Sequence, residues 1–209
     1  MYQLTRKSMH GAVLELTQRD ELLGLLLQEY GLPPLWQRSQ SFATLVHIIL
    51  EQKVSLASAR SVMRRLRQLC PAVKPDAFLQ LECSNLRQIG FSVRKISYCQ
   101  SLAEAIVSGE LKLTALRRLS DEQVIDQLTA IRGIGPWSAG VYLMMALRRP
   151  DAWASGDRAL LLSYAHSAGL QKIPKYEQLD QEAERWRPYR SAAARLLWHA
   201  YLCRNQPAR

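Results

Sequence analysis

The 209-residue sequence has no apolar run long enough to span a bilayer and no charged-then-apolar segment of the secretory type. These absences predict a protein that has no membrane contact and is located in the cytoplasm. In a bacterium it would be associated with the nucleoid. Acidic residues are also scarce, with 18 Asp and Glu against 28 Lys and Arg and a formal net charge of +10. Because a basic surface releases counterions when it neutralises phosphates, this charge favours a nucleic-acid partner.

Metal-ligand patterns are absent as well. The four cysteines form no Cys-x-x-Cys pair and the four histidines no His-x-x-x-His pair, which argues against structural zinc and iron–sulfur clusters. We therefore predict buried free thiols, no catalytic metal and no organic cofactor. The residues concerned are Cys70, Cys83, Cys99, Cys203, His10, His47, His166 and His199.

No stretch alternates apolar and polar residues with the period of two that is typical of strands. Apolar residues recur instead at helical spacing, which predicts an all-α fold of about nine or ten helices. Ser41 and Ser55 are suited to cap helix starts, and Ser120 with Gln123 has the spacing of a capping box. The expected helices are 42–50, 55–69, 93–107, 120–131, 137–148, one from Asp157 and one from about Tyr189.

A glycine-rich turn interrupts two of these helices in the segment LTAIRGIGPWSA, residues 128–139. We expect Gly133 and Gly135 to adopt positive φ and to let another molecule approach the backbone, with Ile134 pinning the two helices. Pro136 suits the first position of the second helix. Since that helix would present the positive end of its dipole here, the turn is predicted to bind a phosphate.

The same twelve residues resemble the helix-hairpin-helix of the helix-hairpin-helix (HhH-GPD) DNA glycosylases, most of all the 3-methyladenine DNA glycosylase II or AlkA type. Three further segments resemble motifs of that family in the same order along the chain. They are ILEQKVSLASA (48–58), LRQIGFSVRKISYCQSLAEAI (86–106) and RWRPYRSAAARLLW (185–198). The likeness covers roughly residues 40–200.

The resemblance implies two all-α lobes with the active site in the cleft between them. One lobe would comprise residues 40–150 and end in the hairpin, and the other would comprise residues 1–39 with 151–209. It also implies that the partner is double-stranded DNA containing damaged bases, and we expect the protein to act on it as a monomer.

Asp157 stands where the family has its catalytic aspartate, after the hairpin and at a helix start. From local sequence alone Asp157 would be an ordinary helix N-cap, and the family match favours catalysis. Glycosidic hydrolysis passes through an oxocarbenium-like sugar, which a carboxylate can stabilise while it orients the attacking water. Asp151 is the competing candidate, and we interpret it as a residue that structures its loop.

Trp137 occupies the position where lyase members of the superfamily carry a lysine that forms a Schiff base with the sugar. Without an amine there, water is the expected nucleophile, so we predict a monofunctional glycosylase. An aromatic face attracts cations, which favours alkylated purines as substrates. Trp186 and Tyr189 are further candidates for the base pocket. Core packing is instead expected for Trp36, Trp153 and Trp198.

The family match also implies DNA contacts at Gln52, Lys53 and Ser55, between two helices. Family members often place an apolar or amide side chain where this chain has Lys53, so Lys53 would either fill the gap left by the flipped base or bind a phosphate. In the latter case Val54 or Leu56 would be the wedge.

The hairpin amides of Gly133, Gly135 and Ser138 would hold the phosphate. A structural Na⁺ or K⁺ ion would be coordinated by the backbone carbonyls of Thr129, Ile131 and Gly133. Two alternatives remain open from the sequence: a glycosylase for oxidised or deaminated bases, and a non-catalytic module that binds DNA through the hairpin.

Overall fold

The computed structural model describes residues 3–205, and these residues form twelve α-helices, two short 3₁₀ helices and no strand. The all-α prediction is confirmed, while the expected number of nine or ten helices is too low. The chain divides into two compact units, one of Met1–Gln37 with Leu143–Arg209 and one of Arg38–Tyr142.

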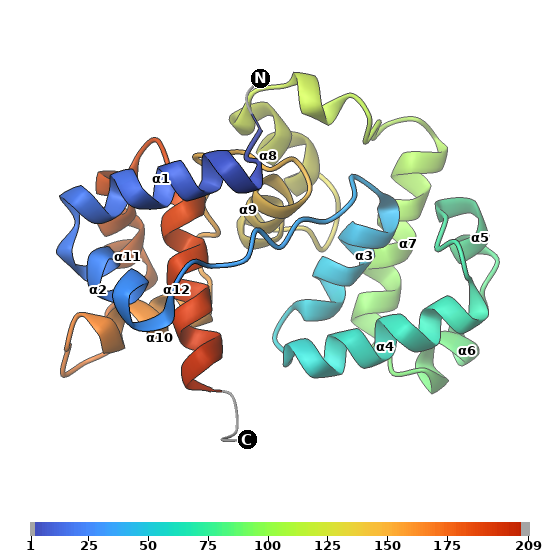
Figure 1. The fold of residues 1–209 in the computed structure, drawn as a ribbon. Coiled ribbons are helices and arrows are strands. Elements are labelled where there is room, and N and C mark those ends of the chain that lie inside the picture. The colour runs from blue at the N-terminus through green and yellow to red at the C-terminus, as the bar shows by residue number, and fades with distance from the viewer. Residues whose placement is uncertain (1–2, 206–209) are drawn as a thin grey trace. The chain divides into compact units, whose positions relative to one another are not determined.

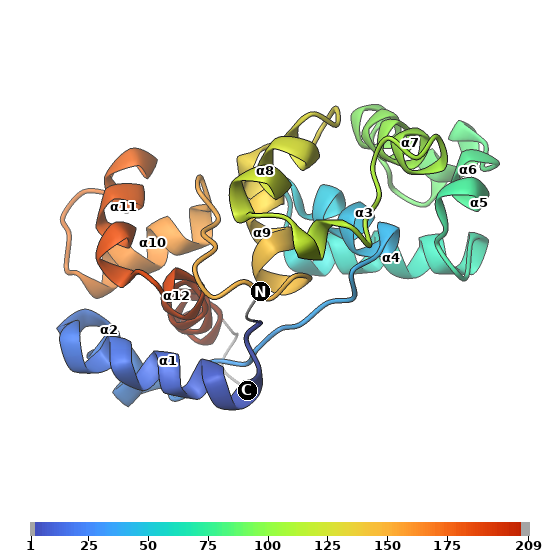
Figure 2. The ribbon, with the colours of Figure 1, turned by 90° about the horizontal axis from the view of Figure 1, so that it is seen from above.

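The discontinuous unit is built around its last helix. In Figures 1 and 2, α12 lies among α1, α2 and α10, and it packs against all three. All residues of this helix from Ser191 to Trp198 are buried, and apart from Arg195 they are small or apolar. The helices of this unit are α1 (Arg6–Arg19), α2 (Glu21–Tyr30), α10 (Arg158–Ser167), α11 (Tyr176–Ala183), η2 (Glu184–Trp186) and α12 (Arg190–Arg204).

The continuous unit is organised around α3, whose residues from Phe42 to Glu51 are nearly all buried. This helix packs against α4 and α7, and α7 in turn carries the short α5 and α6 (Figure 1). The helices are α3 (Phe42–Glu51), α4 (Leu56–Leu69), α5 (Pro75–Leu79), α6 (Cys83–Gln88), α7 (Val93–Val107), η1 (Leu116–Arg118), α8 (Asp121–Thr129) and α9 (Pro136–Met145), the last of which ends beyond the unit.

The predicted helix starts are confirmed by their capping bonds. The side chains of Ser41 and Ser55 accept hydrogen bonds from backbone N–H groups three residues on, and Ser120 forms the expected capping box with Gln123. Two helix ends differ from the prediction. The first of the hairpin helices ends at Thr129 instead of residue 131. The second, α9, ends at Met145 instead of residue 148, and Arg148 has a φ of 55°, which is outside the helical range.

The predicted lobes and the compact units differ mainly in where the continuous unit ends. It ends at Tyr142, within α9, and the predicted lobe ends at residue 150. The last residues of α9 are held by α12: the buried Arg195 donates through Nη2 to the carbonyl of Met144 at 2.7 Å. This bond joins the end of α9 to the discontinuous unit.

The four cysteines differ in burial, and only two of them are buried as predicted. Cys70 and Cys99 are buried free thiols, but the prediction is wrong for Cys83, which is exposed on the short α6, and Cys203 is only partly buried. Within this described range, no group of three or more His, Cys, Asp or Glu side chains could hold a metal ion. None of the described helices is both long and apolar enough to cross a membrane.

Candidate functional site

The hairpin between α8 and α9 is a tight turn pinned by an apolar side chain. Ile134 is 4 % exposed, and its N–H donates to the carbonyl of Ile131 at 3.0 Å. Pro136 is the first residue of α9, as predicted, and the first helical bond runs from Ala139 N–H to the carbonyl of Gly135 at 3.0 Å. The positive end of the α9 dipole therefore lies at this turn.

The two hairpin glycines have different roles. Gly133 has a φ of 89°, and a Cβ atom there would lie 2.0 Å from Cγ of Tyr98, whose ring packs against the glycine backbone. Gly135 does not adopt positive φ, contrary to the prediction, and a Cβ atom there would meet no atom within 4 Å. Gly133 is therefore required by packing and backbone conformation, whereas Gly135 leaves the surface of the turn open.

Gln52 joins the loop after α3 to the hairpin. Its Nε2 donates to the carbonyl of Gly133 at 2.8 Å and to Oγ of Ser138 at 3.0 Å. Ser138 is 2 % exposed, so its hydroxyl is an internal partner of Gln52. The family match implies a DNA contact for Gln52 and, through its backbone amide, for Ser138, and both contacts stay predictions. In this structure the side chains of the two residues fix the hairpin from within the unit. Nothing in the sequence spacing signals this pairing.

Lys53 stands on a loop that is anchored at both ends. Lys95 donates through Nζ to the carbonyl of Leu50 at 2.7 Å, and burial lowers the pKa of this ammonium. On the other side, Ser55 caps α4 by accepting from Ser58 N–H at 3.2 Å. Lys53 itself is exposed and has a φ of 57°, a conformation that non-glycine residues rarely adopt.

The two alternative wedge residues beside Lys53 are also exposed. Val54 and Leu56 have 45 % and 41 % of their surfaces accessible. Val54 lies on the anchored loop and Leu56 is the first residue of α4, and two large apolar side chains exposed side by side are typical of a surface that contacts another molecule. The structure therefore leaves Lys53, Val54 and Leu56 all available as the wedge.

The predicted cation site already has internal donors at two of its three carbonyls. The carbonyl of Ile131 accepts from Ile134 N–H, and that of Gly133 accepts from Gln52. The hydroxyl of Thr129 bonds back to the carbonyl of Ile125 at 2.8 Å. Since a carbonyl oxygen has two lone pairs, coordination of a cation at Thr129, Ile131 and Gly133 stays a prediction.

Asp157 is the N-cap of α10, and its carboxylate is held by two donors. Oδ1 accepts from Leu160 N–H at 2.9 Å and from Nε1 of Trp198 at 3.1 Å, and the residue is 9 % exposed. The sequence predicts only core packing for Trp198, which is 8 % exposed and also orients Asp157. The two residues are far apart in sequence, so no local pattern could have predicted this contact.

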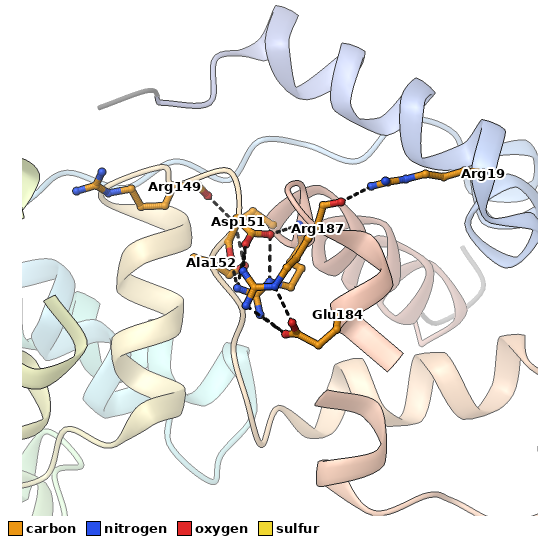
Figure 3. Close-up of polar contacts among 8 residues, drawn as sticks. Arg19, Arg149, Asp151, Ala152, Glu184 and Arg187 are labelled. Atoms are coloured by element: carbon orange, nitrogen blue, oxygen red, sulfur yellow. Dashed lines mark hydrogen bonds and ion pairs between the residues drawn. The ribbon is translucent and has the colours of Figure 1, made fainter. Parts of the chain in front are cut away.

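Asp151 is engaged in ion pairs with two arginines. Its carboxylate accepts from Nη1 of Arg187 at 2.5 Å and from Nη2 of Arg190 at 3.0 Å. Glu184 pairs with the same two arginines, which keeps its pKa below the ordinary value (Figure 3). This network supports the interpretation of Asp151 as a loop-structuring residue.

The candidate pocket aromatics differ in burial. Trp186 is wholly buried, donates through Nε1 to Oδ2 of Asp20 at 2.7 Å, and lies with its ring centroid 5.7 Å from that of Trp153. The prediction that Trp186 lines a base pocket is therefore wrong in this structure, because the ring belongs to the core of its unit. Trp137 and Tyr189 are partly exposed and remain candidates.

Known proteins resemble this chain in sequence and in structure. Residues 46–188, more than half of the chain, match the family described as "HhH-GPD superfamily base excision DNA repair protein". DNA-3-methyladenine glycosylase 1 of Schizosaccharomyces pombe is 29% identical over 166 residues, which cover 78% of this chain and 73% of that protein.

Two solved structures have the same fold over nearly the whole chain. The S. pombe 3-methyladenine DNA glycosylase in complex with abasic DNA matches with a TM-score of 0.84 and 28% identity, covering 90% of this chain and 95% of that one. A DNA-3-methyladenine glycosidase from Bacillus halodurans matches with a TM-score of 0.74 and 29% identity, covering 98% and 95%. The chain therefore belongs to the HhH-GPD superfamily of base excision DNA repair proteins.

Proposed function

We propose that the chain is a monofunctional DNA glycosylase that flips and hydrolytically excises alkylated purines, such as 3-methyladenine and 7-methylguanine, from double-stranded DNA. The observation that carries the proposal is Asp157, a carboxylate fixed by Leu160 and Trp198 at the start of α10. It stands in a chain of a base excision repair family, and relatives of similar length are named 3-methyladenine DNA glycosylases.

Asp157 acts on the sugar of a nucleotide that has left the base stack. As the glycosidic bond breaks, positive charge develops on the sugar, and the carboxylate stabilises this charge and orients the attacking water. Two N–H donors on Oδ1 hold the carboxylate in one orientation before substrate arrives. Such preorganisation makes the stabilisation effective, since no group has to turn during the reaction.

Trp137 determines the outcome of the reaction because it stands where a lyase would have an amine. Water is therefore the nucleophile, and the product is an intact strand with an abasic site. The aromatic face of Trp137 binds the positive charge of a base alkylated on a ring nitrogen. Such a base is already a good leaving group, so one carboxylate suffices.

DNA is held by the continuous unit through the hairpin and the loop that carries Lys53. The open surface at Gly135 lets a phosphate approach the start of α9, where the helix dipole favours an anion. The net charge of +10 adds attraction for any duplex. The protein acts as a monomer in the cytoplasm.

The test is release of labelled bases from duplexes containing 3-methyladenine, 7-methylguanine, hypoxanthine or 8-oxoguanine, under single-turnover conditions. We expect release of the two alkylated purines, and loss of nearly all of it in Asp157→Asn with DNA affinity retained or improved. Preferred release of hypoxanthine or 8-oxoguanine would instead indicate a glycosylase for deaminated or oxidised bases. Binding without any base release would indicate a non-catalytic module.

A further inference from the structure

Two neighbouring residues at the start of α12, Arg190 and Ser191, bond to every backbone carbonyl of the segment 149–152, which leads from α9 toward α10. A segment without helix or strand has no regular hydrogen-bond partners for its carbonyls, and Arg190 and Ser191 supply those partners here. The bonds run from Ser191 Oγ to the carbonyls of Arg149 (2.6 Å) and Ala152 (3.0 Å), from Ser191 N to Pro150 (3.0 Å), and from Arg190 Nη2 to Asp151 (2.8 Å).

The side chain of Asp151 reinforces this attachment. Its Oδ1 accepts from both the backbone N–H and Nε of Arg190, at 3.3 and 3.1 Å, and its Oδ2 accepts from Nη2 at 3.0 Å. Figure 3 shows the carboxylate of Asp151 facing Arg187, with Glu184 bonded to the arginines. The planar guanidinium of Arg190 thus bonds to the carboxylate and the carbonyl of one residue together, a geometry that the point charge of a lysine does not reproduce.

The same helix also holds both ends of the longer segment that contains residues 149–152. Arg195, which lies wholly inside the unit, donates to the carbonyl of Met144 before it, and Trp198 donates to Asp157 after it. Burial lowers the pKa of Arg195 to about 10. Met144, residues 149–152 and Asp157 are thus all bonded to α12. Because a helix is rigid, these bonds set the distance between residues 149–152 and the carboxylate of Asp157.

We propose that Arg190 and Ser191 are positioning residues for Asp157. They hold residues 149–152 against the first turn of α12, so that Asp157 reaches Trp198 two turns further along the same helix in a single geometry. The inference rests on the proposed function of Asp157. It assigns a role to the Arg-Ser pair in the RWRPYRS segment beyond the stability of the fold.

Ser191→Ala and Arg190→Lys test the proposal in the full-length protein. At saturating enzyme and well below the melting temperature, we expect the single-turnover rate of 7-methylguanine release to fall by about 10- to 100-fold, as for a small misplacement of a reacting group. The dissociation constant for duplex containing an abasic site should stay within about twofold. Arg190→Ala should be slower than Arg190→Lys, since lysine retains one donor to Asp151.

Two control variants separate positioning from general stability. Val13→Ala shortens a wholly buried side chain on α1 in the same unit, which takes part in none of the bonds to residues 149–152, and we expect it to lower the melting temperature by removing buried apolar surface. Glu184→Gln alters the exposed partner of Arg187 and Arg190 and leaves the four carbonyl bonds in place. Both controls should excise at the wild-type rate.

The result that overturns the proposal is a rate in Ser191→Ala and Arg190→Ala within threefold of wild type, or equal to that of Val13→Ala at a matched melting temperature. Loss of DNA affinity without loss of rate would also overturn it, because it would place the pair in DNA binding. Wild-type protein that releases no base from any duplex would refute the proposed function itself, an outcome distinct from either of these.

Discussion

Replacing Gly133 by alanine is expected to destabilise the hairpin through two separate effects. The backbone of Gly133 has a φ of 89°, which an alanine adopts only with strain, and its new Cβ atom would lie 2.0 Å from Cγ of Tyr98. Cγ is the ring atom nearest the backbone and does not move when the ring turns about the Cβ–Cγ bond, so only a new χ1 rotamer of Tyr98 or a shift of the backbone relieves the contact. The substitution therefore requires Tyr98 to leave its packed rotamer or the backbone of the turn to shift.

The size of the effect follows from these two terms. Left-handed backbone conformation costs a non-glycine residue about 1–2 kcal/mol, and overpacking a well-filled site costs about 1–3 kcal/mol. Their sum, about 2–5 kcal/mol, corresponds in a protein of this size to a lowering of the melting temperature by about 4–20 °C. The unit that carries the hairpin, Arg38–Tyr142, should lose this stability.

Gly135→Ala is the matched control, because a Cβ atom there meets no atom within 4 Å and the backbone does not have positive φ. Its melting temperature should be unchanged or slightly higher, since alanine reduces the freedom of the unfolded chain. The new methyl group would instead obstruct a phosphate at the turn. We expect weaker binding to every duplex without a change in which lesion is preferred, because phosphate contacts carry no sequence information.

The assay combines thermal unfolding with fluorescence anisotropy of labelled duplex. Equal melting temperatures for the two alanine variants would refute the assignment of Gly133 to packing. Unchanged affinity with altered lesion choice in Gly135→Ala would refute the hairpin as the DNA anchor. The double variant Gly133→Ala/Tyr98→Ala isolates the steric term: Gly133→Ala should cost about 1–3 kcal/mol less when Tyr98 is absent.

Three further predictions concern side chains around the turn. Borohydride should trap no covalent protein–DNA adduct, because Trp137 supplies no amine, and Trp137→Ala should slow release of cationic bases more than of hypoxanthine; an adduct on a gel, or equal slowing, would contradict these roles. Lys53→Leu should reduce the slope of log affinity against log salt by about one phosphate contact, because a lysine that binds phosphate releases a counterion. An unchanged slope in Lys53→Leu, together with weaker unstacking of a 2-aminopurine beside the lesion in Lys53→Ala, would identify Lys53 as the wedge. Gln52→Met should speed amide hydrogen exchange across the hairpin and weaken duplex binding, because it removes the bonds to Gly133 and Ser138. Gln80→Met, just after α5, is the control for loss of an amide, and equal exchange in both variants would show that Gln52 does not fix the hairpin.

The helical class, most helix starts and the family could be predicted from the amino-acid sequence. Amphipathic spacing and side-chain caps are local properties, so Ser41, Ser55 and Ser120 are recognisable as caps from their neighbours along the chain. Asp157 is likewise predicted correctly at a helix start. These predictions depend on residues within one or two helical turns of each other.

Contacts between distant segments could not be predicted in this way, because they arise only when the helices pack. Gln52 bonds to a hairpin about eighty residues away, Trp198 is a partner of Asp157 as well as a core residue, and Trp186 lies in the core instead of a base pocket. A buried tryptophan produces the same periodic signal in the sequence whether its N–H faces Asp157 or Asp20. Which acceptor a donor reaches depends on the packing of the helices and not on local spacing.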